Sequence, residues 1–131
     1  MNYLLRLIAC LSVLCMVNAL PAQSFSPKRE FRGVWVATVA NIDFPRQPTT
    51  NPIAHKEQWK YLLEQFKKTG FNAVIVQVRP AADAFYPSEL VPWSEYLTGK
   101  QGVAPEPLYD PLEFMIEEAH KMGFEFHAWF N

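Results

Sequence analysis

The sequence predicts an α/β protein in which parallel strands and helices alternate in the order β-α-β-α-β. Short apolar runs rich in β-branched and aromatic residues at 31–40, 71–79 and 124–131 are separated by two segments with helical periodicity. The sequences Lys-Thr-Gly-Phe at 68–71 and Lys-Met-Gly-Phe at 121–124 repeat the same junction between a helix and a strand. Strands joined by crossover helices are parallel. Two architectures fit this order, a doubly wound sheet and a (β/α)8 barrel.

Residues 1–22 precede this pattern and predict a secretory signal peptide. Arg6 supplies the positive charge of a short n-region, and the apolar stretch 7–17 is too short to span a bilayer. Small residues follow, and we expect cleavage after Ala22, with Ala19 as the alternative. The mature chain is then expected to be exported, to the periplasm or the extracellular space, with no stable insertion in a membrane.

A short linker, 23–28, and a single domain over 29–131 are expected to follow the signal peptide. Both cysteines, Cys10 and Cys15, lie in the signal peptide, so the mature chain is expected to have no disulfide framework. The sequence Leu-Ile-Ala-Cys at 7–10 also resembles a lipoprotein cleavage site, but it leaves only a short hydrophobic stretch that a charge interrupts. Lipid anchoring is therefore the weaker alternative.

The first strand is predicted at 31–40, and a proline-rich loop follows it. Asn51 is suited to cap the next helix, with Pro52 at its first position. Gly70 predicts the end of this helix, since glycine tolerates the left-handed conformation found there. The apolar face repeats at intervals of three and four residues and consists of Trp59, Leu62, Leu63 and Phe66.

The second strand is predicted at 71–79, and a long connection, 80–109, rich in proline and aromatic residues, leads to a second helix. Asp110 and Pro111 are typical of a helix start, and Gly123 predicts the helix end. The apolar face of this helix consists of Leu112, Met115, Ile116 and Ala119.

The alternation of side chains along the strands favours the barrel over the doubly wound sheet. In the second strand Val74, Val76 and Val78 share one apolar face, which suits packing against helices. Gln77 and Arg79 share the other face and lie at the carboxyl end of the strand, as expected for strands that line a barrel with its site at that end. A dinucleotide-binding sheet would show a glycine-rich turn after the first strand, and Val-Ala-Asn-Ile-Asp-Phe-Pro contains no glycine. We therefore expect the N-terminal β-α-β-α-β portion of a (β/α)8 TIM barrel.

Polar and aromatic residues near the carboxyl ends of the three strands are the candidates for substrate binding. They are Asn41, Asp43, Gln77, Arg79, Asp83, His127, Trp129 and Asn131. A buried guanidinium needs a partner, so Arg79 is equally well explained by a structural ion pair, for example with Asp83. His127 also suits a hydrogen-bonding role in the core, and Trp129 suits either packing or stacking on a sugar ring.

Composition and spacing argue against several other classes of function. The formal net charge is −1, and no basic run is longer than Lys67-Lys68, so we expect no nucleic-acid partner. The three histidines, at 55, 120 and 127, are scattered, and no metal-ligand spacing is present. We therefore expect no metal and no cofactor.

Three long segments carry a resemblance to a known family. They are REFRGVWVATVANIDFP at 29–45, FNAVIVQVRPAADAFYPSELVPWSEYLTGKQG at 71–102 and YDPLEFMIEEAHKMGFEFHAWFN at 109–131. Together they closely resemble the N-terminal part of bacterial glycosyl-hydrolase-like family ten. The resemblance implies a TIM-barrel domain of exported proteins that hydrolyse glycosidic bonds, in some relatives those of cell-wall glycan strands, with a polysaccharide or peptidoglycan glycan as substrate.

No catalytic residue can be assigned within this sequence. Glycoside hydrolysis usually needs two carboxyl groups, and for the acidic residues on the predicted loops a role in turns or in solvation is the simpler explanation. The resemblance implies catalytic acids on later strands. Because a TIM barrel takes about 250 residues and eight strands, we expect the chain to be a fragment of an exported glycoside hydrolase. A non-catalytic glycan-binding barrel and an inactive truncated product are the alternatives.

Overall fold

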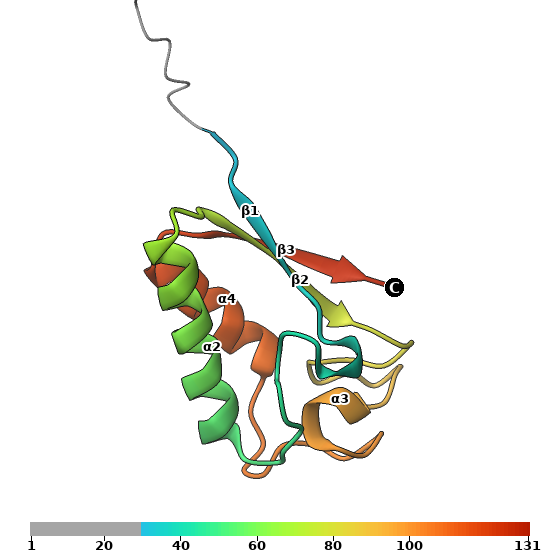
Figure 1. Ribbon diagram of the computed structural model, residues 1–131. Helices are drawn as coiled ribbons and strands as arrows, with labels where there is room; N and C mark the ends of the chain where they lie inside the picture. The colour runs from blue at the N-terminus through green and yellow to red at the C-terminus, as the bar shows by residue number, and fades with distance from the viewer. Residues whose placement is uncertain (1–29) are drawn as a thin grey trace, which may run out of the picture. The chain divides into compact units, whose positions relative to one another are not determined.

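The computed structural model describes residues 30–131, and its compact unit, 31–131, is built on a small parallel sheet (Figure 1). In chain order the elements are β1 (Gly33–Val36), the 3-10 helix η1 (Val39–Asn41), α2 (Pro52–Lys68), β2 (Ala73–Arg79), α3 (Glu95–Thr98), α4 (Pro111–Lys121) and β3 (Glu125–Phe130). The strands lie in the order β1-β2-β3, and both pairs are parallel. The predicted α/β class is confirmed, and the sheet is compatible with part of a TIM barrel. The predicted signal peptide, 1–22, and linker, 23–28, lie outside the described residues.

The first strand is shorter than the predicted range 31–40, because the chain turns sharply after Val36. The backbone N–H of Ala37 donates to the Asp43 carboxylate at 2.8 Å, which closes a turn at the end of β1. Ala40 and Asn41 both adopt the left-handed conformation, with φ values of 53° and 54°. Such a conformation ends a strand, and it costs a residue with a Cβ about 1–2 kcal/mol.

Both long helices begin and end where the sequence predicts. The Asn51 side chain accepts a hydrogen bond from Ile53 N–H, and the Asp110 carboxylate accepts from the N–H groups of Leu112 and Glu113. Each helix then has a proline in its first turn. The glycines at 70 and 123 follow the helix ends with φ values of 88° and 78°, as a left-handed cap requires.

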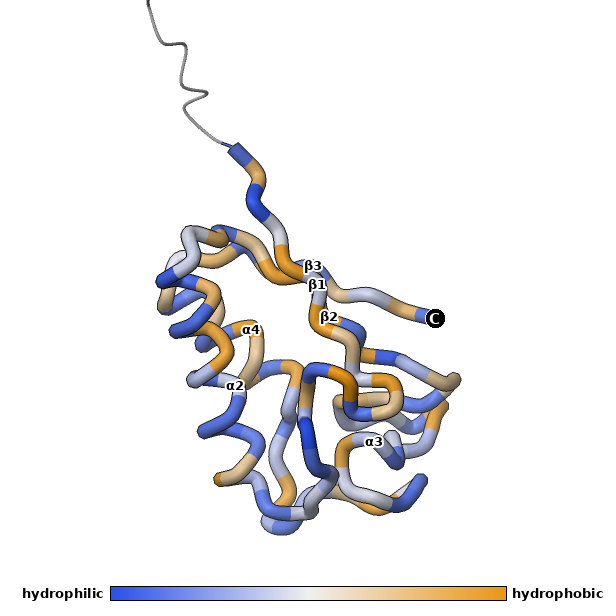
Figure 2. Tube along the Cα trace, viewed as in Figure 1, coloured by the Kyte–Doolittle hydropathy of each residue, from blue (hydrophilic) through white to orange (hydrophobic). Residues whose placement is uncertain are grey.

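The core lies between the sheet and the helix pair α2 and α4, which cover the same face of the sheet (Figure 1). Trp59 of α2 is fully buried, and its indole N–H donates to the carbonyl oxygen of Met115 in α4 at 3.1 Å. The predicted apolar face of β2 is confirmed, since Val74, Val76 and Val78 are fully buried there. Both helices carry hydrophilic as well as hydrophobic residues, as amphipathic helices do (Figure 2).

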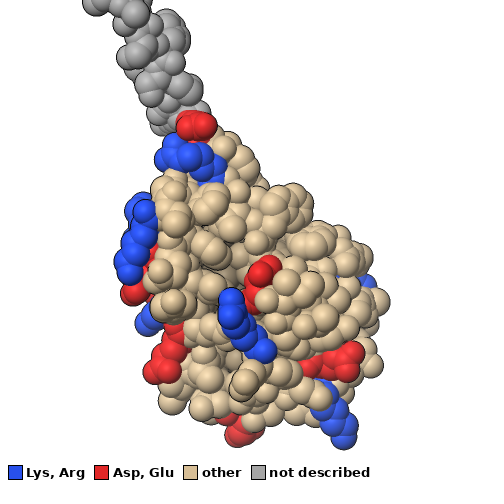
Figure 3. Space-filling view, in the orientation of Figure 1, with Lys and Arg blue, Asp and Glu red and all other residues tan. Residues whose placement is uncertain are grey.

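The opposite face of the sheet carries large aromatic residues that remain exposed. Trp35 is 63% exposed, Phe31 is 58% exposed, and the indole of Trp35 meets that of Trp129 edge to face at 5.2 Å. At the end of β3, Phe130 is also exposed. Lys, Arg, Asp and Glu are interspersed on the surface of the unit that Figure 3 shows. Among residues 30–131 there is no helix of sufficient length and hydrophobicity to cross a bilayer.

Candidate functional site

The candidate site lies at the carboxyl ends of the strands, where barrel proteins of this order place their active sites. The loops after β1 and β2 meet there. Asn41 Nδ2 donates to the carbonyl oxygens of Pro45 and Tyr96, both at 2.6 Å, and Thr49 N–H donates to Leu97 O at 3.0 Å. The two loops therefore form one connected rim, and the Asn41 amide holds them together.

Gln77, at the carboxyl half of β2, is fully buried and joins β2 to the turn that follows β1. Its side-chain Oε1 accepts from the backbone N–H groups of Thr38 and Val39, both at 3.0 Å. Its backbone carbonyl oxygen accepts from the Thr38 hydroxyl at 2.8 Å. The two N–H donors fix the orientation of the amide, so its Nε2 points away from them. Nε2 is buried and has no hydrogen-bond partner among the described residues. The oxygen of the side-chain amide is thus used in structural hydrogen bonds, whereas its nitrogen has no partner.

Arg79 ends β2 at an irregularity of the sheet. Gln77 pairs with Trp129, but Arg79 pairs with Phe130, so the register skips Val78. A bulge of this kind re-aims side chains, and such bulges are frequent beside active sites. The Nε of Arg79 is buried and lacks a hydrogen-bond partner within residues 30–131, and no salt bridge to Asp83 forms. The structure gives no support to an ion pair between Arg79 and Asp83.

Asp83 lies in the turn that follows β2 and is 1% exposed. Its Oδ1 accepts from Ala81 N–H at 3.0 Å, while its Oδ2 is buried without a partner in the described part of the chain. Ala82, between them, has a φ of 57°, which is strained for a residue with a Cβ. Strained backbone of this type clusters at ligand sites when the surrounding structure holds it in place.

The remaining predicted residues divide between the rim and the middle of the sheet. Asn131 extends the rim, since its N–H donates to Arg79 O at 3.0 Å and its Nδ2 donates to Pro80 O at 3.1 Å. Trp129 lies level with Gln77 on β3. His127 is paired with Ile75, further from the carboxyl end, and its ring contacts Phe31 at 5.5 Å. The structure therefore brings Gln77, Arg79 and Asp83 together on one segment and leaves His127 lower on the sheet.

Two predicted residues have structural roles that the sequence did not reveal. Asp43 closes the turn after β1, and Asn41 uses its amide hydrogens to join the two loops. Thr38 was absent from the predicted set, although it is fully buried and donates two hydrogen bonds to Gln77, one from its backbone N–H and one from its hydroxyl. The sequence feature that could have indicated this role is a threonine within an otherwise apolar predicted strand. No group of three or more potential metal ligands occurs in the part of the chain that the structure describes.

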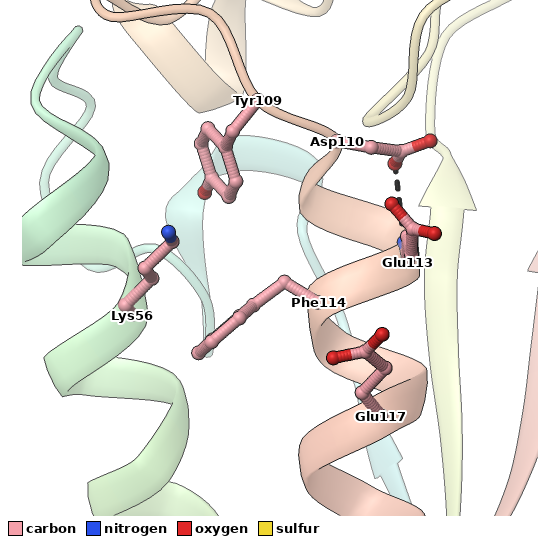
Figure 4. Close-up of a pocket in the computed structure, with 6 residues that line it drawn as sticks. All are labelled: Lys56, Tyr109, Asp110, Glu113, Phe114 and Glu117. Carbon is pink, nitrogen blue, oxygen red and sulfur yellow. Dashed lines mark hydrogen bonds between the residues drawn. The ribbon is translucent and has the colours of Figure 1, made fainter.

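A hollow of about 180 Å³ lies on the helix layer between α2 and α4 (Figure 4). The ammonium of Lys56 lies 4.9 Å from the centre of the Tyr109 ring and 5.2 Å from that of Phe114. Asp110, Glu113 and Glu117 complete the lining. Lys56 already occupies the position over the rings that a cationic ligand would take, so this hollow is the weaker candidate.

A buried histidine lies next to this hollow and connects α2 to the long loop. His55 is 1% exposed, its Nε2 is 3.2 Å from Leu97 O, and its Nδ1 is 3.0 Å from the Tyr109 hydroxyl. A carbonyl oxygen only accepts, so Nε2 carries the proton and the tyrosine hydroxyl donates to Nδ1. Burial lowers the pKa of His55, although hydrogen bonds to the backbone of Leu97 and Thr49 oppose that shift. Burial, with a smaller effect from Asp110, raises the pKa of Tyr109. Both groups are therefore neutral and structural at pH 7.

Comparison with known proteins gives one family. Residues 30–131 match the family model described as Glycosyl hydrolase-like 10. The chain is 57% identical over 103 residues to "Glycosyl hydrolase YngK" of Bacillus subtilis (strain 168). The aligned region covers 79% of this chain and 20% of that protein. It is 39% identical over 118 residues to "Glycosyl hydrolase DigH" of Escherichia coli (strain K12). That aligned region covers 85% of this chain and 26% of that protein. The chain thus spans about a quarter or less of the length of these relatives.

Proposed function

The chain belongs to the Glycosyl hydrolase-like 10 family, and we propose that it forms part of the barrel of an exported glycoside hydrolase that acts on a polysaccharide or a peptidoglycan glycan. The proposal rests on three buried polar atoms at and just after the carboxyl end of β2 that have no hydrogen-bond partner among the described residues. They belong to Gln77, Arg79 and Asp83. Buried polar groups are nearly always hydrogen-bonded, and exceptions need an explanation.

The surroundings of these residues support a glycan as the ligand. The two loops of the rim and the aromatic residue Trp129, which pairs with Gln77, lie at the end of the sheet where parallel α/β proteins bind their ligands. Aromatic rings beside hydrogen-bonding amides, carboxylates and guanidinium groups suit sugars, which present both apolar faces and hydroxyl groups. In this proposal the residues at the end of β2 bind and orient the glycan. The catalytic acids lie outside the residues assigned here.

The test is the release of new reducing ends by the full-length protein from purified peptidoglycan glycan strands and from neutral polysaccharides. Steady release from at least one of these substrates is the expected result. Binding without release would instead support a non-catalytic glycan-binding barrel. The absence of both binding and release for every substrate would contradict the proposal.

A further inference from the structure

The short helix α3 is held in place by a buried histidine. His55 of α2 is 1% exposed and contacts two segments that lie far from it in the sequence. Its Nε2–H donates to the carbonyl oxygen of Leu97 in α3 at 3.2 Å, and its Nδ1 accepts from the Tyr109 hydroxyl at 3.0 Å. The same carbonyl oxygen accepts from Thr49 N–H at 3.0 Å. The imidazole therefore joins the start of α2 to α3 and to the end of the long loop, and both of its nitrogens are used.

Of the elements that meet at His55, α3 is the one that depends most on these contacts. It has only four residues, too few for a helix that is stable by itself. Leu97 is fully buried, and the adjacent carbonyl oxygen of Tyr96 accepts from Asn41 Nδ2 at 2.6 Å. The helix α2 is instead anchored in the core by Trp59 and Leu63, which are fully buried. Local opening begins in the least anchored segments of a protein, so α3 separates from His55 more readily than α2 leaves the core.

The closed arrangement is specific for the neutral imidazole. A second proton on His55 turns Nδ1 from an acceptor into a donor, and the Tyr109 hydroxyl must then direct its own hydrogen elsewhere. The proton also places a positive charge in a buried position, which is costly without a negative partner. None of the carboxylates among the described residues forms an ion pair with His55, and burial lowers its pKa.

The charged and titratable groups on the adjoining segments do not offset this cost. Lys56 adds positive charge, since its ammonium lies 4.9 Å from the centre of the Tyr109 ring. Tyr109 stays neutral because burial raises its pKa, and the Asp110 carboxylate caps α4. The remaining charged residues close to these contacts in the sequence are exposed, and water and salt screen them. They are Arg46, Glu57, Glu95, Lys100 and Glu106.

We propose that His55, Leu97 and Tyr109 form a pH-sensitive latch that holds α3 closed while His55 is neutral. Protonation of His55 favours the open form, in which α3 has left the imidazole and water solvates the charge. Opening exposes Leu97, so the open form is minor at pH 7. Its population increases as the pH decreases below about 6.5, the ordinary pKa of an exposed histidine. The open form also lacks the bond from Asn41 to Tyr96, so the rim of the candidate site loosens with the latch.

The experiment is hydrogen exchange of the full-length protein, followed by mass spectrometry between about pH 7.5 and about pH 5 and corrected for the intrinsic pH dependence of exchange. The opening constant, the ratio of open to closed forms, is compared for a peptide containing residues 94–99 and a peptide containing 73–79 of β2. In the wild type the constant of the first peptide is expected to increase by up to about tenfold per pH unit below about pH 6.5. The β2 peptide is expected to be about a hundredfold better protected throughout, because its exchange needs global unfolding.

Two substitutions separate His55 from other titrating groups. His55→Gln keeps a side-chain donor but cannot take up a proton, so its opening constant for 94–99 should vary by less than about twofold over the same pH range. His120→Gln is the same change at an exposed position of α4, and this matched control should keep the wild-type dependence. His55→Asn replaces His55→Gln if the latter does not fold.

Three outcomes would overturn the latch. The first is an opening constant for 94–99 that does not change with pH in the wild type. The second is the same pH dependence in the His55 variant as in His120→Gln. The third is equal protection of 94–99 and β2 at every pH, because the opening would then be global unfolding and not the release of α3.

Discussion

Replacement of Gln77 by leucine tests the contact that joins β2 to the turn after β1, beside the candidate site. The substitution keeps the approximate size of the side chain but removes the acceptor of two backbone N–H groups, those of Thr38 and Val39. A buried donor left without a partner costs about 1–3 kcal/mol. Thr38 is fully buried, whereas Val39 is partly exposed and can recover part of the loss from water.

The loss of Nε2, which has no partner, returns about 1 kcal/mol to the variant. The expected net decrease in the free energy of unfolding is therefore about 2–4 kcal/mol. Urea unfolding of the full-length protein measures it, with Gln101→Leu as the control because Gln101 is exposed. A loss in Gln77→Leu within about 0.5 kcal/mol of the control would refute the role of the amide.

Three further predictions concern the core, the pH dependence and export. Trp59→Ala should lower the free energy of unfolding by about 3–5 kcal/mol, because it opens a cavity and frees a buried carbonyl oxygen; a loss below about 1 kcal/mol by urea unfolding would contradict this packing. The lowered pKa of His55 means that the unfolded state takes up a proton more readily, so stability should fall as the pH decreases below about 6.5. His55→Asn should flatten this slope and the exposed His120→Asn should not; equal slopes in the two variants would refute it. Mass spectrometry of the secreted protein should give an N-terminus near Gln23, and an uncleaved N-terminus would contradict export by this signal.

Much of the fold could be predicted because local sequence determines it. The caps Asn51 and Asp110 act through side-chain oxygens within three residues of their donors, and the glycines after the helices allow a left-handed turn. The buried face of β2 follows from strict alternation. The early end of β1 could not be predicted, since it depends on Asp43 bonding back to Ala37 and on strained residues of ordinary type. The short helix α3, within a loop rich in proline, was not predicted because four residues are too few to show a helical periodicity.

The positions of the candidate residues along the strands were predictable from the sequence, but the contacts that each residue makes were not. The position of Gln77 and Arg79 at the end of a strand follows from the sequence, yet the partners of Gln77 lie 38 and 39 residues away along the chain. The bulge at Val78 is a property of the pairing between two strands, and alternation along one strand cannot show it. That Arg79 lacks Asp83 as a partner could likewise be seen only in three dimensions.

The central claim is that the carboxyl end of β2 binds the glycan on which the protein acts. Arg79→Lys tests it most directly, because lysine keeps the positive charge but loses the planar donor group and the Nε–H. The rate of release of reducing ends per folded molecule and the melting temperature are measured on the same full-length sample, with Arg46→Lys at an exposed loop position as the control. A decrease in rate of about tenfold or more, at a melting temperature equal to that of the control, is the predicted result. An unchanged rate per folded molecule in Arg79→Lys would contradict the claim.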